Sequence, residues 1–276
     1  MLIDAHMHLW SLGRLDYDWL TPALPLLYRD FGIDDYRQAA RELPLSGCVL
    51  VQAAASEAET DWLLDLASRH DEIVGVVGWF DPTRPGGADK LRARRDAGMV
   101  GVRPMLQDWP NASEILALAC VKGMELLETS GLIFEALVGP HQLGVVEELA
   151  ERHPGLTIVL DHGGKPDIRS SAWQPWADDV AALANHPNVR CKLSGLATEA
   201  QPGATTDCFQ PYAQQLLKCF GDDRLLWGSD WPLIGMRMSL AQWHATAAIL
   251  AADLGLSGDK LFGDNARETY RLEIAS

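Results

Sequence analysis

The run LIDAHMHL at residues 2–9 is typical of a buried β-strand that ends in polar residues. Leu2 and Ile3 are apolar, and side chains two residues apart on a strand point to the same face. His6 and His8 are therefore expected to project together into one space. They could serve there as functional groups, or as a hydrogen-bonded pair that only fills a polar hole in the core.

Seven further runs of this kind follow, each separated from the next by a turn and an amphipathic stretch. They are GCVLVQAA (47–54), IVGVVGWF (73–80), MVGVRPM (99–105), LIFEALV (132–138), LTIVLDH (156–162), NVRCKLSG (188–195) and RLLWGSD (224–230). Near-continuous apolar strands that alternate with helices indicate a parallel sheet buried on both faces. Eight such units without a change in composition predict an α/β fold, a single (β/α)₈ TIM barrel domain over residues 1–276. A doubly wound open sheet is the competing fold.

The intervening helices are predicted from their apolar spacing. The clearest follows Ser56, which has Glu59 three residues later in the spacing of a capping box. The other predicted helices cover Ile33–Leu43, Ala88–Ala97, Ala112–Thr129, His141–His153, Trp176–Asn185, Tyr212–Phe220 and Leu240–Ala252. A last helix around Lys260–Leu272 is expected to pack on the outside of the barrel. The long segment Ser11–Gly32 is a candidate lid over the barrel mouth.

Composition narrows the class of function. The chain has 276 residues, 47% of them hydrophobic, and a formal net charge of −15. This acidity argues against a nucleic-acid partner, which needs a basic face, and favours a small-molecule ligand. No apolar run approaches the roughly 20 residues of a membrane span, and a strand at residues 2–9 leaves no room for a signal peptide. The five cysteines show no C-x-x-C pairing and are expected to be reduced core thiols, so a cytoplasmic location is predicted.

In a barrel of this type the functional site lies at the carboxyl ends of the strands. Polar residues follow the strand bodies at those ends: His6, His8, Gln52, Trp79, Asp81, Arg103, Glu135, Asp161, His162, Lys192, Ser194 and Asp230. Strands one and eight are neighbours in a closed barrel, so His6, His8 and Asp230 are expected to converge. Adjacent residues of a strand face opposite ways, so only one of Asp161 and His162 is expected to point inward, and we favour His162.

In this order, the motifs IDAHMHLW, VLVQA, VVGWFD, GVRP, VLDHGGKP, CKLSGL, WGSDWP and NARETY resemble the amidohydrolase superfamily. More narrowly, they resemble its branch of lactone hydrolases that act on sugar lactones and on a pyrone dicarboxylate. The resemblance implies that His6, His8 and Asp230 help to hold a divalent metal where one is bound, and that Asp230 is the base towards the attacking water. His162 matches the sixth-strand histidine of the superfamily.

Two positions depart from the fully metallated pattern of the superfamily. Arg103 stands where strand four would carry a lysine, and Glu135 is the polar group nearest to the end of strand five. The lactonase branch shares these departures and includes members that work without metal. We therefore expect no strictly required cofactor and at most one divalent metal, such as zinc, with Glu135 as a candidate fourth ligand.

The predicted catalytic residues are Asp230, His162, His6, His8 and Arg103. The predicted substrate-binding residues are Lys192, Trp79, Trp231, Gln52 and Glu135. Arg103 could bind ligand oxygens or pair with Glu135 in a purely structural contact. Lys165 is expected to anchor its loop rather than to act on the ligand.

This set predicts a hydrolase that opens a sugar (aldono-) lactone by Asp-assisted attack of water on the lactone carbonyl. A neutral lactone is favoured, because few cations are expected at the rim. Two alternatives stay open: a metal-dependent decarboxylase of the same superfamily and a non-catalytic sugar-binding barrel. The sequence leaves the particular sugar and the oligomeric state undefined.

Overall fold

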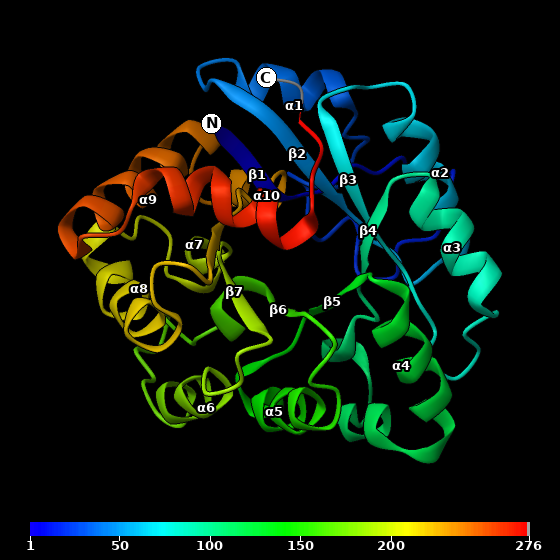
Figure 1. Ribbon diagram of the computed structural model, residues 1–276. Helices are drawn as coiled ribbons and strands as arrows, with labels where there is room; N and C mark the ends of the chain where they lie inside the picture. The colour runs from blue at the N-terminus through cyan, green and yellow to red at the C-terminus, as the bar shows by residue number, and fades with distance from the viewer. Residues whose placement is uncertain (275–276) are drawn as a thin grey trace.

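The eight apolar runs form eight parallel strands that pair in the order of the chain, as the computed structural model of residues 1–274 shows (Figure 1). The strands are β1 (Leu2–Met7), β2 (Leu45–Val51), β3 (Ile73–Gly78), β4 (Met99–Val102), β5 (Ile133–Ala136), β6 (Ile158–Leu160), β7 (Val189–Leu193) and β8 (Leu225–Trp227). The order β1 to β8 without a crossover is that of a barrel and confirms the predicted (β/α)₈ fold over the doubly wound sheet.

Helices surround the strands, one or more after each strand (Figure 1). They are α1 (Ile33–Ala40), α2 (Glu57–Ala67), α3 (Ala88–Asp96), α4 (Leu118–Ser130), α5 (Leu143–Arg152), α6 (Trp176–Leu183), α7 (Leu196–Glu199), α8 (Thr206–Phe220), α9 (Leu240–Leu254) and α10 (Asn265–Tyr270). The predicted helix 112–129 is divided into a 3₁₀ segment (Ala112–Leu116) and α4, because Ala117 between them is extended. Helix α8 begins before the predicted start and carries Pro211 inside it.

The barrel closes between β1 and the segment that follows β8. The amide of Asp230 donates to the carbonyl of His6 (2.8 Å), and the amide of His8 donates to the carbonyl of Trp231 (2.7 Å). Below these bonds the buried carboxylate of Asp4 accepts the amide and the hydroxyl of Ser229, together with the hydroxyl of Tyr36. One carboxylate thus joins the first strand, the last strand and the first helix.

The core has two parts. A large apolar cluster fills the space between strands and helices. A smaller one fills the barrel itself and is built from Ile3, Ala5, Val49, Val51, Val77, Ile133, Val159 and Leu226, with Ala266, Tyr270 and Leu272 from the end of the chain. Because side chains alternate along a strand, these are the inward members of each run.

The C-terminal helix corrects one prediction. The segment Lys260–Leu272 was expected on the outside of the barrel, but α10 contacts β1 and β8 and inserts Tyr270 among the barrel-filling residues. In Figure 1 the red helix α10 lies across the strands, inside the ring of the other helices. Ala266, Tyr270 and Leu272 supply the apolar surface that covers the end of the barrel opposite the strand carboxyl ends.

The predicted capping box is half formed. The hydroxyl of Ser56 accepts the amide of Glu59, as expected. The Glu59 carboxylate, however, does not return to Ser56 but accepts the amides of Ala53 and Ala54 (3.0 and 2.7 Å). It therefore fixes the loop after β2, which lies at the barrel mouth.

All five cysteines are free. Cys48, Cys120 and Cys191 are buried, as expected of core thiols, whereas Cys208 is exposed and lies on the surface of α8. Within residues 1–274, no helix has the length and apolar character needed to cross a membrane.

The closure of the barrel generates a stability prediction. Replacing Asp4 by Ala removes the acceptor of the buried Ser229 amide and of the Tyr36 hydroxyl, and each unsatisfied donor costs about 1–3 kcal/mol. We expect Asp4→Ala to lower the free energy of unfolding by about 3 kcal/mol or more in urea titrations. Asp89→Ala is the control, since that side chain is 96% exposed and its loss should change stability by less than about 0.5 kcal/mol. Equal midpoints for the two variants would contradict this account of the closure.

Candidate active site

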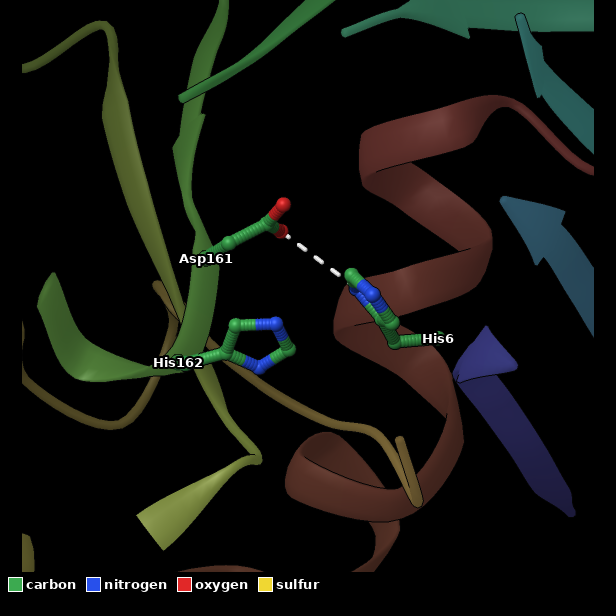
Figure 2. A group of neighbouring side chains, drawn as sticks. All are labelled: His6, Asp161 and His162. Atoms are coloured by element: carbon green, nitrogen blue, oxygen red, sulfur yellow. Dashed lines mark ion pairs between the residues drawn. The ribbon is translucent and has the colours of Figure 1, made fainter. Parts of the chain in front are cut away.

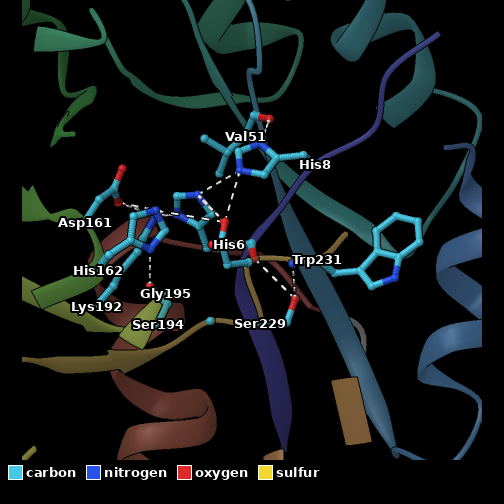
Figure 3. Close-up of polar contacts among 12 residues, drawn as sticks. His6, His8, Val51, Asp161, His162, Lys192, Ser194, Gly195, Ser229 and Trp231 are labelled. Atoms are coloured by element: carbon cyan, nitrogen blue, oxygen red, sulfur yellow. Dashed lines mark hydrogen bonds and ion pairs between the residues drawn. The ribbon is translucent and has the colours of Figure 1, made fainter. Parts of the chain in front are cut away.

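Five of the predicted residues meet at a pocket of about 420 Å³ in the barrel mouth. Its lining includes His8, Arg103, His162 and Asp230, and the ring of His6 lies directly beneath, against His8 and His162. They come from the ends of β1, β4, β6 and β8. The convergence expected of His6, His8 and Asp230 is thus present in the structure, and Figure 3 shows the histidines directed towards one another.

The hydrogen bonds of His8 define where its lone pair points. Its Nδ1 lies 2.7 Å from the carbonyl of Val51, which can only accept, so Nδ1 carries the hydrogen. Its Nε2 is therefore an acceptor, 3.1 Å from His6 Nε2 and 3.5 Å from Asp230 Oδ1. Burial lowers the pKa of His8, which favours this neutral form.

His6 is held from below by a buried lysine. Lys192 Nζ lies 2.9 Å from His6 Nδ1, and an ammonium has only hydrogens to offer, so Nδ1 accepts. Burial, and then the charge of Lys192, lowers the pKa of His6 well below its ordinary value. A neutral His6 with an accepting Nδ1 carries its hydrogen on Nε2, which lies 3.1 Å from the accepting Nε2 of His8 and also 3.3 Å from Nη1 of Arg103.

Lys192 does not reach the pocket, although it was predicted to bind substrate. It is fully buried and pairs with Glu135 (2.7 Å) and Asp161 (3.2 Å). Glu135 is also buried and accepts the hydroxyl of Tyr270 from the C-terminal helix. Glu135 thus pairs with Lys192 rather than with Arg103, the alternative partner considered for it, and it is not among the residues that line the pocket or that could hold a metal.

Asp161 corrects the expectation that only one of Asp161 and His162 points inward. Both do, as Figure 2 shows: Asp161 Oδ1 lies 3.4 Å from His6 Nδ1, and the rings of His6 and His162 are 4.5 Å apart. Strand β6 already ends at Leu160, and Asp161–Gly164 form a 3₁₀ turn in which His162 has a φ of 55°. The alternation of a strand therefore no longer applies. Asp161 also accepts from Arg103 (3.3 Å), so Arg103 has Asp161 rather than Glu135 as its ion-pair partner.

Two glycines make room for the histidines. A side chain at Gly195 would have its Cβ 2.6 Å from the ring of His162, and one at Gly228 would have its Cβ 2.7 Å from the Cβ of His6. Gly195 also has a φ of 66°, which side chains disfavour. Its neighbour Ser194 contacts His162 Nδ1 through the hydroxyl (2.9 Å), so the motif CKLSGL positions this ring.

Asp230 lies at the centre of the group. Its Oδ1 is 3.5 Å from His8 Nε2, 3.9 Å from His6 Nε2 and 4.0 Å from His162 Nε2. Burial raises the pKa of Asp230, but His162 and His8 more than offset this, and the net pKa is lowered. The carboxylate is therefore ionised at neutral pH. Its backbone is left-handed, with a φ of 58°, a conformation that clusters at functional sites.

Three other predicted ligand contacts lie elsewhere. Trp231 packs its ring against Phe31 and Tyr36 in the core, and Figure 3 shows it directed away from the histidines. Gln52 is fully buried and donates to the carbonyl of Arg103 (2.7 Å), so it positions that arginine. Trp79 lines a second cavity beside the pocket.

The pocket holds more cations than the sequence led us to expect. Arg103, Lys165, Arg169 and Arg237 line it, together with Asp108, Glu199 and Asp230. Lys165 donates to Gln107 (2.8 Å), which agrees with the anchoring role predicted for it. Arg169, Glu199 and Arg237 were missed: the two arginines lie in loops and Glu199 ends the short helix α7, and nothing in the residue pattern marks any of them. From the candidate lid Ser11–Gly32, Trp19 and Leu24 line the pocket, so this segment forms part of its wall.

One divalent metal could be held by His6, His8 and Asp230. Their facing atoms are 3.1–3.9 Å apart. Ligands of a tetrahedral zinc with bonds of 2.0–2.1 Å are separated by about 3.3 Å, so the donor set fits one ion. His8 also donates through its other nitrogen to a carbonyl, as metal-bound histidines do. A second group, His6, Asp161 and His162, overlaps the ammonium of Lys192, which already occupies that side of His6.

An eight-stranded parallel barrel with histidines, an aspartate and an arginine at its carboxyl-end mouth has the fold and the polar residues of a barrel enzyme. The amidohydrolase family profile matches residues 3–272, and the chain belongs to this family.

The chain is 36% identical to an L-fucono-1,5-lactonase of Burkholderia ambifaria over 99% of its own length and 97% of that protein. It is 34% identical to an L-fucono-1,5-lactonase of Burkholderia multivorans, over 98% and 96% of the two chains. The solved structure of an amidohydrolase from Burkholderia multivorans with bound zinc superposes with a TM-score of 0.93, at 31% identity over 99% and 100% of the two chains.

The burial of His162 generates a prediction about pH. Burial lowers its pKa from 6.5 to about 4. Between pH 6.5 and 4, His162 is therefore protonated in the unfolded chain but neutral in the folded chain. Its contribution lowers the free energy of unfolding as the pH falls through this window. We expect His162→Gln to lose less stability than the parent between pH 7 and pH 4, by up to about 3 kcal/mol in urea unfolding. Parallel stability curves for parent and variant would contradict the buried neutral state.

Proposed function

We propose that this protein hydrolyses a neutral aldonolactone to the open hydroxy acid, with Asp230 as the base. The observation that carries the proposal is the ionised carboxylate of Asp230 at the pocket floor, with three histidine Nε2 atoms 3.5–4.0 Å away. The nearest histidine nitrogen, Nε2 of His8, lies 3.5 Å from this carboxylate, which leaves the carboxylate able to bind a water molecule. The names of the two Burkholderia relatives support a sugar lactone as the substrate.

In the proposed reaction, Asp230 takes a proton from water as the water oxygen attacks the lactone carbonyl carbon. A positioned base of this kind contributes about 10²–10⁴ in rate. Arg103 and His162, which face the same pocket, stabilise the oxyanion that develops on the carbonyl oxygen. The ring C–O bond then breaks, and Asp230 returns the proton to the leaving alkoxide, which becomes the free hydroxyl of the acid.

His6, His8 and Lys192 act as support in this proposal. Lys192 holds His6 through Nδ1, so that His6 donates from Nε2 towards His8 and keeps both rings in place around Asp230. A divalent cation, when bound by His6, His8 and Asp230, would supply Lewis-acid polarisation of water or of the carbonyl. It would require His6 Nε2 without its hydrogen, so it competes with the arrangement that Lys192 favours. We therefore propose that metal is not strictly required.

The charge of the pocket supports a neutral substrate. The sequence suggested this because few cations were expected at the rim, whereas in the structure cations and carboxylates are nearly balanced. Four cationic side chains and three carboxylates line it, so the formal charges nearly cancel. Paired charges with free donors and acceptors suit a ligand rich in hydroxyl groups. We further propose one barrel domain over residues 1–276, with a small-molecule substrate and no nucleic-acid or membrane partner. The five free cysteines support a cytoplasmic location.

A lactone panel tests the proposal. We expect purified protein to release one acid per turnover, above the spontaneous rate, from at least one aldonolactone of four to six carbons. The assay is a pH-indicator measurement on protein stripped of metal and on protein loaded with zinc, with metal content determined for both. We expect no more than one zinc per chain and substantial activity after stripping.

Only the spontaneous rate with every lactone would contradict the proposed reaction and leave the sugar-binding barrel as the reading. Complete loss of turnover on stripping, restored by one metal per chain, would contradict the metal-independent site and favour an arrangement like that of the metal-dependent decarboxylases.

A further inference from the structure

A second cavity opens beside the catalytic pocket in the barrel mouth. It has a volume of about 530 Å³, and we call it the side pocket. Trp19, Ala53, Met105 and Asp108 line both cavities, so the two lie side by side and share a wall. The loops after β1, β2, β3 and β4 build the side pocket, whereas the catalytic pocket extends over the second half of the barrel.

The side pocket differs from the catalytic pocket in its chemistry. Three tryptophans line it, Trp19, Trp79 and Trp109, and all three are only partly buried. Four aspartates accompany them, Asp16, Asp18, Asp81 and Asp108, and no lysine, arginine or histidine lies in its lining. The four cationic residues of the mouth thus lie on the catalytic side.

Part of this lining is already fixed and part is free to bind. The indole N–H of Trp19 donates to the carbonyl of Ala53 (2.8 Å), which holds that ring in place between the two cavities. Asp81 is occupied, since it accepts the amide and the hydroxyl of Thr83. Within residues 1–274, the carboxylates of Asp16, Asp18 and Asp108 make no hydrogen bond or ion pair, although each lines the cavity.

Flat aromatic faces beside free carboxylates are what a sugar ring requires. Its apolar C–H face packs on an indole, and its hydroxyls donate to ionised acceptors in strong hydrogen bonds. An anionic ligand would be repelled by carboxylates without counter-charges. Each cavity alone has the size of a small-molecule site, so a single lactone would leave the side pocket empty.

We propose that the side pocket binds a second, neutral sugar ring, joined by a glycosidic bond to the lactone in the catalytic pocket. The preferred substrate is then the lactone of a disaccharide aldonic acid. Water opens the lactone ester, and the glycosidic bond remains intact. This inference rests on the proposed lactonase function and specifies its substrate class.

The test compares matched substrates on the full-length protein. Hexono-1,5-lactones are assayed with and without a glucosyl or galactosyl ring at each free oxygen in turn. We expect at least one disaccharide lactone to exceed its parent lactone by about tenfold in kcat/KM, because remote contacts lower the barrier at the reacting carbon. Trp109→Ala should remove this advantage and leave the parent lactone within about twofold. Trp173→Ala, at an exposed tryptophan outside both cavities, is the control.

Melting curves guard against a folding defect, and Trp109→Phe and Asp18→Asn provide milder variants of the same wall. The proposal is overturned if no disaccharide lactone surpasses its parent, or if Trp109→Ala slows both substrates equally. A greater advantage for a lactone that carries an amine substituent would also overturn it, because the side pocket would then be a cation site.

Failure of the lactonase function itself gives a different result. In that case no lactone is turned over, and the side pocket is tested directly by titrating lactose and following tryptophan fluorescence. Quenching that Trp109→Ala abolishes would support a sugar subsite. No change up to high millimolar lactose would refute it.

Discussion

The contact between the first strand and the segment after the last strand is the constraint on which the site depends. Asp4 accepts the amide and hydroxyl of Ser229, and two main-chain bonds join His6 to Asp230 and His8 to Trp231. Without this closure, His6 and His8 at the start of the chain and Asp230 near its end would not share a pocket. The same contact places Asp230 in its left-handed conformation, with the carboxylate facing the histidine rings. The contacts that close the barrel are thus the same contacts that bring the site residues together.

A group of buried charged side chains lies beneath the pocket and determines which nitrogen of His6 carries the hydrogen. Lys192, Glu135 and Asp161 are fully buried, where unpaired charges are very costly, and each is compensated by its neighbours. Lys192 contacts His6 Nδ1 from beneath the pocket. The hydroxyl of Tyr270 donates to Glu135 and so joins the C-terminal helix to these buried charges. A built-in ammonium thus occupies the side of His6 where a second metal ion would otherwise lie. This offers a physical reason for the proposal that the site holds no more than one metal ion.

The sequence predicts the barrel and most of the candidate site because both depend on regular periodicity. Eight apolar runs define the strands, and the carboxyl-end rule brings His6, His8, Arg103, His162 and Asp230 together. The predictions fail where a strand ends earlier than expected, or where an ion pair forms between residues that are distant in the sequence. Asp161 turns inward because β6 stops at Leu160, and Glu135 pairs with Lys192 across the barrel. Trp231 packs in the core, and the loop residues Arg169 and Arg237 line the pocket. Neither arrangement is indicated by a residue pattern in the sequence.

The central claim is that Asp230 is the base for water, and one variant tests it most directly. Asp230→Asn keeps the shape of the side chain and its place among the histidines but cannot take a proton. The measurement is kcat on a responsive lactone, together with lactone binding and thermal unfolding. The account predicts a fall in kcat of about 10²–10⁴ with binding and melting temperature close to the parent. Activity within a few-fold of the parent, or a large loss of stability with normal turnover per folded molecule, would contradict it.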